Sequence, residues 1–145
     1  MKSPFISALE SRVLLADGGM GTLLHARGVP TSACLDATVI ENPDLVRRIH
    51  EEYIAAGADI IETDTFGANR FRLARYGLEA KVRDINFKAA RLARDAREIS
   101  GHPVFVAGAV GPTGRMLATV GDVTSSATPM PRAPEDTRQF DDAVA

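Results

Sequence analysis

Apolar residues along this chain form short continuous runs and longer periodic stretches. The short runs are residues 13–16, 60–61 and 104–107, and each is followed by a segment rich in polar residues or glycine. Continuous apolar runs of this length are typical of strands that are buried on both faces of a sheet. We therefore expect three β-strands, the first of them a buried strand at residues 13–16.

The stretch between the first two expected strands predicts a helix. Asn42 is a good N-cap and Pro43 suits the first helical position, while Gly57 supplies the stop. The preceding residues, 23–37, are expected to form a short turn of helix and a long loop. The face of the helix that we expect to be buried is formed by Leu45, Ile49, Tyr53 and Ala56.

Two further helices are expected before the third strand. A short one spans residues 69–76 and is closed by Gly77. A longer one ends at Gly101, and Pro103 blocks its continuation. The buried face of this longer helix is expected to contain Val82, Ile85, Ala89, Leu92, Ala96 and Ile99.

Alternation of strands and helices in this order predicts an α/β fold with parallel strands joined by right-handed crossovers. Three such strands leave open edges and a poorly covered face. Residues 121–133 are rich in Ser, Thr, Pro and Gly and are expected to form a loop. A helix start follows at Pro134, and we expect the chain to end inside that helix. The architecture is therefore expected to be interrupted.

Composition and charge narrow the class of partner. The chain has 145 residues and a formal net charge of −2, so it lacks the basic field that binds nucleic acid. Glu10 and Arg12 interrupt the apolar stretch near the N-terminus, and no window reaches the length of a membrane span, so neither export nor membrane insertion is expected. The single cysteine, Cys34, permits no intrachain disulfide. We expect a cytoplasmic protein with a small-molecule partner.

The strongest candidate chemistry lies at residues 17–22, Asp-Gly-Gly-Met-Gly-Thr, where the first expected strand ends. Glycine lets backbone N–H groups approach a bound anion, and Asp17 adds a carboxylate where α/β folds bind their ligands. An amino acid suits this pair, because its carboxylate would meet the N–H groups and its ammonium group would meet Asp17. A dinucleotide fingerprint is excluded because Leu24 replaces its last glycine, and no Gly-Lys-Ser/Thr phosphate motif occurs.

A second polar cluster, residues 62–69, follows the second expected strand. Glu62, Thr65 and Asn69 are its candidate pocket residues, although alternate strand residues face opposite sides and cannot all reach one pocket. Capping of the next helix by these hydroxyl and carboxylate groups would explain the same pattern. Asn69 fits either a helix cap or a ligand contact.

No metal ligand is predicted in this chain. His50 and Glu51 begin like a zinc-protease motif, but Ile54 occupies the place of its second histidine. Cys34 by itself cannot form a structural zinc site, which needs four ligands.

These segments, in this order, resemble the start of a homocysteine S-methyltransferase domain. The resemblance is continuous over residues 13–117 and resumes at residues 134–136 after a loop that looks inserted. Residues 61–75 and 78–79 are most similar to bacterial forms fused to a methylenetetrahydrofolate reductase or to cobalamin-dependent methionine synthase. The segments that carry the resemblance are residues 15–22, 34–36, 42–46, 56–70 and 107–114.

The resemblance implies a TIM (β/α)8 barrel that transfers a methyl group to the sulfur of homocysteine to give methionine. Such barrels need about 250 residues, so residues 1–145 would form a truncated N-terminal portion of about three βα units, a partial homocysteine-binding domain. It assigns no catalytic residue here. The substrate-binding residues that it implies are Asp17 and the backbone of Gly18, Gly19 and Met20, together with Glu62, Thr65 and Asn69.

The resemblance also implies a zinc ion, held by three cysteines from later strands, that keeps the homocysteine thiol in its reactive thiolate form. Cys34 lies outside that motif, so the zinc ligands are absent from this chain, and we expect the chain alone to transfer no methyl group. Methyl-cobalamin, methylated folates, S-methylmethionine and betaine all fit as donor. The sequence does not fix the oligomeric state.

Two other functions fit the same residues. One is a non-catalytic amino-acid-binding or interaction module that keeps the half-pocket. The other is an unrelated α/β enzyme that binds a phosphorylated ligand at the glycine-rich turns. A reading frame that continues into a Gly-Gly-Cys-Cys motif would favour the methyltransferase, and binding of phosphate but not of an amino acid would favour the last.

Overall fold

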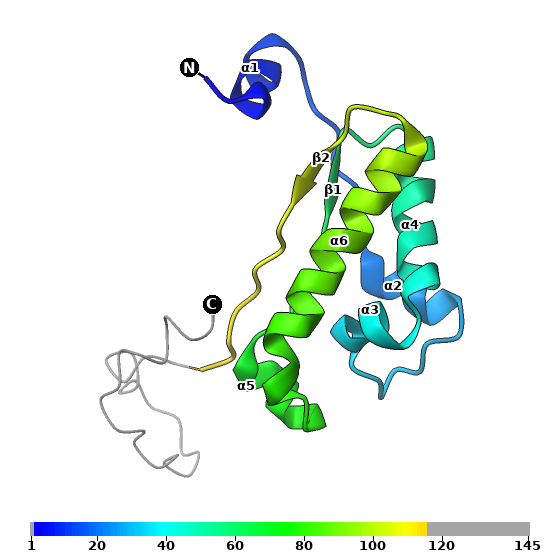
Figure 1. The fold of residues 1–145 in the computed structure, drawn as a ribbon, viewed down its shortest axis with the longest axis vertical. Helices are drawn as coiled ribbons and strands as arrows, with labels where there is room; N and C mark the ends of the chain where they lie inside the picture. Colours follow the sequence, from blue (N-terminus) through cyan, green and yellow to red (C-terminus); the bar gives the residue numbers. More distant parts are fainter. Residues whose placement is uncertain (1, 116–145) are drawn as a thin grey trace, which may run out of the picture.

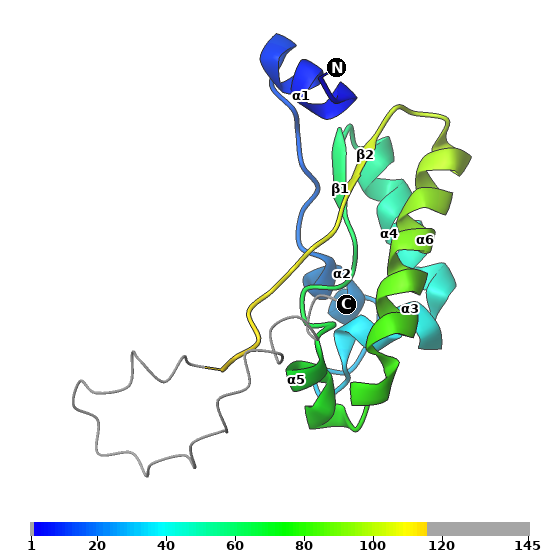
Figure 2. The ribbon, with the colours of Figure 1, turned by 60° about the vertical axis from the view of Figure 1, so that its left-hand side comes forward.

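The computed structural model describes residues 2–115, which fold as a short parallel sheet with helices packed on one face (Figures 1 and 2). The expected loop at residues 121–133 and the expected final helix lie outside the described residues. The helices are α1 (Pro4–Ser11), α2 (Met20–Ala26), α3 (Thr38–Glu41), α4 (Pro43–Ala55), α5 (Arg70–Leu73) and α6 (Val82–Ser100). The strands are β1 (Ile60–Glu62) and β2 (Phe105–Ala107), and the short 3-10 helices are η1 (Leu35–Ala37), η2 (Ala74–Tyr76) and η3 (Glu79–Lys81).

Strands β1 and β2 pair in parallel, in the register Ile60 to Phe105 and Glu62 to Ala107. The chain travels from β1 to β2 through α5 and the long helix α6, which is a βαβ crossover. The predicted parallel arrangement is therefore confirmed for these two strands, and the carboxyl ends of both lie at the same edge of the sheet (Figure 1).

The first expected strand, residues 13–16, is present only as an isolated bridge beside β1, and it is not buried. Ala16 forms an isolated parallel bridge with Ile60, and the carbonyl oxygen of Leu15 accepts hydrogen bonds from the N–H groups of Asp59 and Ile60. Val13 is 92% exposed and Leu15 is 58% exposed. The expectation of burial was wrong, because no second layer covers these side chains in the described part of the chain.

Helix α4 begins as its capping residues predict. The side-chain oxygen of Asn42 accepts a hydrogen bond from the N–H of Leu45 at 3.3 Å. The buried face is wider than expected, because α4 contacts α2, α3, α6 and β1. Tyr53 is half-buried and Ala56 is exposed, contrary to the prediction for Ala56. The buried residues of α4 are Leu45, Val46, Ile49, His50 and Ile54.

Helix α6 ends at Gly101, whose left-handed backbone (φ +67°) favours glycine. Ile99, expected on the buried face, is 63% exposed. Ala93 is buried instead and packs with Ile61 and Val104 where the helices meet the sheet. The buried face of α6 consists of Ile85, Ala89, Leu92, Ala93 and Ala96.

Two parts of the chain are more helical than predicted. The expected long loop at residues 23–37 ends in η1, and the residues between this loop and α4 form α3, in which Thr38 and Val39 are buried. The unexpected helix α1 is capped by the Ser3 hydroxyl, which accepts a hydrogen bond from the N–H of Ile6 at 3.3 Å. None of the residues of α1 is buried. Within residues 2–115, no helix combines the length and apolar character needed to span a bilayer.

Candidate binding site at the carboxyl ends of the strands

Asp17 connects the first polar segment to the second. Its N–H donates a hydrogen bond to the carbonyl oxygen of Ile60 at 2.9 Å. Its Oδ2 accepts a hydrogen bond from the N–H of Glu62, also at 2.9 Å. Two of the predicted site residues, 45 positions apart in sequence, are therefore neighbours at the carboxyl end of β1.

The Asp17 carboxylate has no cationic partner in the described part of the chain. It is half-buried, and burial is the main cause that raises its pKa, while the N–H of Glu62 acts in the opposite direction. Tyr53 lies close by. The pKa of its hydroxyl is raised, mainly by burial and to a smaller extent by the charge of Asp17. A half-buried carboxylate without a basic neighbour suits a cationic group brought by a ligand.

The glycine turn after Asp17 is closely packed. The Tyr53 hydroxyl donates a hydrogen bond to the carbonyl oxygen of Gly19 at 3.2 Å, and the Thr22 hydroxyl donates to the same oxygen at 3.0 Å. A Cβ on Gly18 would lie 3.0 Å from the Tyr53 hydroxyl oxygen. The N–H groups of Gly18 and Gly19, and that of Met20 at the start of α2, donate to no acceptor among the described residues. Three backbone donors are therefore available beside Asp17.

Thr65 ties the loop after β1 to the loop after β2. Its hydroxyl donates to the carbonyl oxygen of Ala109 at 2.7 Å and lies 2.7 Å from the hydroxyl oxygen of Thr63. The N–H of Ala109 in turn donates to the Thr63 hydroxyl oxygen at 3.1 Å. Both threonines are buried, so this predicted site residue has a structural partner in the loop after the neighbouring strand.

Asn69 acts as a helix cap. Its side-chain oxygen accepts a hydrogen bond from the N–H of Arg72 at 3.1 Å, at the first turn of α5. Capping, one of the two alternatives for this residue, is thus present. The contacts of Asn69 do not bring it against Asp17, whereas Glu62 is in direct contact with Asp17.

Two acids near this loop, the half-buried Asp36 and the buried Asp64, were not predicted as site residues. Asp36 accepts a hydrogen bond from the N–H of Gly67 at 2.7 Å through Oδ1. Asp64 is 8% exposed, and its Oδ2 has no hydrogen-bond partner within residues 2–115. Burial, with a smaller contribution from the charge of Asp36, raises the pKa of Asp64 to about 7. The sequence shows that both residues are acidic. It does not show how far they are buried, because segments without helical or strand periodicity give no pattern from which burial can be predicted.

Glycine permits two close backbone approaches around this loop. A Cβ on Gly67 would overlap the Asp36 carboxylate, and a Cβ on Gly111 would overlap the carbonyl oxygen of Phe66. The loop after β2 can therefore approach the backbone of Phe66, in the loop after β1, this closely only because Gly111 has no side chain. The same loops carry Thr65 and Ala109, so their contact sets the shape of this end of the sheet.

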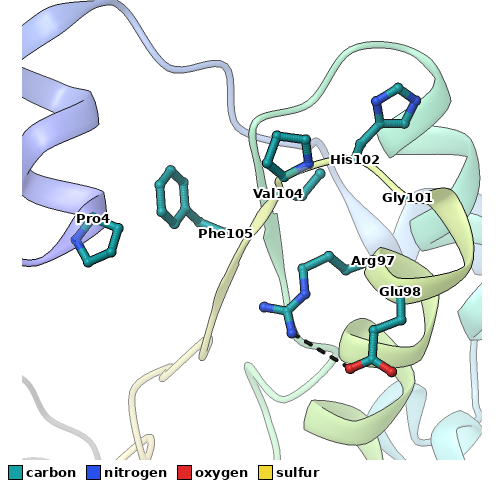
Figure 3. Close-up of a pocket in the computed structure, with 8 residues that line it drawn as sticks. Pro4, Arg97, Glu98, Gly101, His102, Val104 and Phe105 are labelled. Atoms are coloured by element: carbon teal, nitrogen blue, oxygen red, sulfur yellow. Dashed lines mark ion pairs between the residues drawn. The ribbon is translucent and has the colours of Figure 1, made fainter.

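A hollow of about 570 Å3 lies at the opposite end, between α1 and the junction of α6 with β2 (Figure 3). Phe105 lines it, and the ion pair from Arg97 to Glu98 spans 3.8 Å at its side. This hollow contains none of the predicted site residues. We place the candidate site at Asp17 and Glu62, because backbone donors without an acceptor and a carboxylate without a cationic partner, both judged within residues 2–115, converge there.

The residues present do not fit a zinc ion. No group of three or more His, Cys, Asp or Glu side chains in the described ranges is placed to hold a metal. Cys34 is buried and burial raises the pKa of its thiol, which disfavours the thiolate that zinc binds. Metal chemistry therefore has no ligand set in the described part of this chain.

The described fold is that of a parallel βα protein with a candidate polar site at the carboxyl ends of its strands. A family model described as homocysteine S-methyltransferase matches residues 14–143. The chain belongs to the homocysteine S-methyltransferase family. The predicted fold class, a truncated portion of a TIM (β/α)8 barrel, is thereby confirmed.

Solved structures of similar proteins include the homocysteine methyltransferase MmuM from Escherichia coli. Its oxidized form is 36% identical, with a TM-score of 0.68, and the match covers 78% of this chain and 42% of that one. Its metallated form is 37% identical, with a TM-score of 0.67, covering 77% and 42%. The chain thus spans less than half the length of these structures.

Proposed function

We propose that this chain supplies the pocket for the amino-acid end of homocysteine, in a protein that transfers a methyl group to the homocysteine sulfur to give methionine. The observation that carries the proposal is the Asp17 carboxylate, oriented by the N–H of Glu62 at 2.9 Å and without a cationic partner in the described part of the chain. Membership of the homocysteine S-methyltransferase family supports the choice of ligand.

The proposed binding mode assigns each end of the ligand's charged head to a different group. The ammonium group meets Asp17, with the exposed Glu62 side chain adding negative charge nearby. The carboxylate meets the backbone N–H groups of Gly18, Gly19 and Met20, which have no acceptor among the described residues. Thr65 and Asn69 support the pocket by holding the neighbouring loop and helix.

The described residues would not activate the homocysteine thiol. A thiol is a weak nucleophile near neutral pH until it loses its proton, which zinc would bring about. Because residues 2–115 contain no suitable ligand set, we propose that the 145-residue chain binds homocysteine without activating it. A non-catalytic amino-acid-binding module is the second candidate, and this lack of ligands favours it for the chain by itself.

A methyl-transfer assay tests whether the chain by itself activates the homocysteine thiol. The chain is incubated with homocysteine, zinc and each donor in turn: methyl-cobalamin, a methylated folate, S-methylmethionine and betaine. We expect no methionine above the protein-free background with any donor. Turnover with any one of them would show that the chain activates the thiol and would overturn this part of the proposal.

The binding mode is tested by calorimetry with a pair of ligands and a pair of proteins. The ligands are L-homocysteine and its analogue without the amino group, 4-mercaptobutanoate. The proteins are the wild-type chain and Asp17→Asn, whose amide oxygen can still accept the Glu62 N–H. We expect Asp17→Asn to weaken homocysteine binding by about 10- to 100-fold, since a charge-assisted hydrogen bond contributes about 1.5–3 kcal/mol. Binding of the analogue should be the same in both proteins.

The matched control is Asp84→Asn, which neutralises an exposed aspartate on α6 that pairs with Lys81. It should bind both ligands like the wild type. Equal homocysteine affinity in the wild type and Asp17→Asn would contradict the assignment of the ammonium group to Asp17.

A further inference from the structure

The loop after β1, residues 63–69, is held by side chains from two helical segments as well as by the threonine contacts described above. Asp36 in η1 accepts the N–H of Gly67 at 2.7 Å. The side-chain amide of Asn86 in α6 donates to the carbonyl oxygen of Ala68 at 2.8 Å. The polar groups that hold this loop are thus paired along most of its length.

Asp64 is the exception within this loop. It is more than nine-tenths buried, and its Oδ2 has no partner among the described residues. An ionised carboxylate here would be a buried and uncompensated charge, whereas the protonated acid carries no charge. The loop as folded therefore accommodates the acid far better than the carboxylate.

The charged groups around Asp64 make ionisation harder. Asp36, from η1, adds a like charge that raises the pKa of Asp64 beyond the effect of burial, to about 7. Arg72, from α5, acts on Asp36, where its charge lowers the pKa. Helix α6 contributes the neutral Asn86. No basic side chain in the described residues offsets the charge of an ionised Asp64.

We propose that Asp64 is a positioning residue for the amino-acid pocket: loop 63–69 stays packed against η1 while the buried carboxyl group is uncharged, and its ionisation releases the loop and weakens ligand binding. The carboxylate can reach water only if the loop moves, and movement of the loop strains the bond from Gly67 to Asp36. Glu62, which orients Asp17, immediately precedes this loop. The inference rests on the proposed function, because the ligand whose binding weakens is the proposed one.

The test compares the full chain with Asp64→Asn, which keeps the shape of the carboxyl group but cannot ionise. Homocysteine affinity and amide hydrogen exchange of Gly67 are measured from about pH 6 to about pH 8.5, with exchange corrected for its intrinsic pH dependence. In the wild type we expect affinity and protection each to fall about tenfold, mostly between pH 6 and pH 7, because a linked equilibrium changes up to tenfold per pH unit below the pKa of the packed state and levels off above it. In Asp64→Asn both should stay flat, apart from ligand titration, which is common to the two proteins.

A second variant, Asp36→Asn, gives a directional test. Its amide oxygen can still accept the Gly67 N–H, but the like charge beside Asp64 is gone. The loss of Gly67 protection should therefore level off at a lower pH than in the wild type, and its total size should be smaller. Asp84→Asn, which changes an exposed aspartate of α6, should follow the wild-type profile.

The outcomes separate the two claims. Wild-type and Asp64→Asn profiles that coincide in exchange, or a transition that moves to higher pH in Asp36→Asn, would overturn the role of Asp64. Absence of homocysteine binding at every pH would count against the proposed function. In that case the exchange profiles, which need no ligand, would still support or overturn the pH-dependent loop.

Discussion

The two ends of the short parallel sheet are built in different ways. At the amino ends, α1 is attached by surface contacts: the rings of Phe5 and Phe105 meet edge to face at 5.2 Å, and Arg12 pairs with Asp59 at 2.7 Å. At the carboxyl ends, loops carry buried polar groups such as Thr65 and Asp64. Both ends expose apolar residues, among them Val13 and Val110, but the buried polar side chains of this sheet lie at its carboxyl ends.

This contrast shows at which end of the sheet the molecule tolerates unfavourable contacts. An exposed apolar side chain costs little, whereas a buried carboxyl group without a partner destabilises the fold. Asp64 is such a group, and it lies at the end where Asp17 and the free backbone donors converge. Polar groups that do not stabilise the fold are expected where a ligand is bound. The contrast thus supports binding at the carboxyl ends.

The largest expected effect comes from Asp64 at the carboxyl ends. Its pKa is raised from 3.8 to about 7 in the folded chain, so its contribution to stability is present at acid pH and is lost as the pH rises from about 4 through 7. A pKa difference of this size between the unfolded and folded chain corresponds to roughly 4 kcal/mol. Urea denaturation should show this loss in the wild type between about pH 4 and pH 7, and Asp64→Asn should not show it. If the free energy of unfolding changes with pH in the same way in the two proteins, the proposed contrast between the two ends of the sheet is contradicted.

His50 is a buried residue of α4. Its contribution to stability should depend on pH with the opposite sign. The side chain is completely buried, neither ring nitrogen has a partner in the described residues, and burial lowers its pKa from 6.5 to about 4. Stability should therefore be retained above pH 6.5 and lost by roughly 3 kcal/mol as the pH falls through 4. His50→Leu should abolish this loss in acid denaturation curves. An unchanged acid transition in that variant would assign it to other groups.

The contact between the two carboxyl-end loops should be sensitive to a single methyl group. Gly111→Ala places a Cβ against the backbone oxygen of Phe66, and we expect it to lower the free energy of unfolding by about 2 kcal/mol, as overpacking does. Gly108→Ala is the matched control, because its Cβ would meet nothing within 4 Å. Equal effects of the two substitutions in urea denaturation would refute the close approach of the loops.

The smallest effect is expected at the amino ends. Arg12→Ala removes the ion pair that holds the pKa of Asp59 near 2. An NMR titration should show this pKa rising toward 3.8, held down only by the N–H of Leu15. The unfolding midpoint should hardly change, because exposed ion pairs stabilise little. A large fall in the midpoint would mean that α1 is an integral part of the fold.

The sequence predicted the features that depend on local chemistry. Asn42 and Gly101 marked helix ends correctly, because capping requires particular residues at particular positions. The apolar run at residues 60–61 identified β1. Burial of Val13 and Ile99 was predicted wrongly, since it depends on what else packs against them rather than on their own period.

The candidate site was predictable where glycine and acid residues stood together at a strand end. The contact between Asp17 and Glu62 follows from parallel pairing of their segments. The burial of Asp64 and the packing of Tyr53 against the glycine turn could not be predicted, because both depend on how loops fold back on their neighbours. Loops lack the periodicity that reveals burial in helices and strands.

The most direct measurement is an NMR titration of the isotope-labelled chain with L-homocysteine. If the ligand binds at the carboxyl ends, the amide signals of Gly18, Gly19 and Glu62 shift as homocysteine is added, and the signals of α1 do not. Shifts confined to the hollow beside α1 and Phe105, or no shifts at ligand concentrations in the millimolar range, would contradict binding at the carboxyl ends.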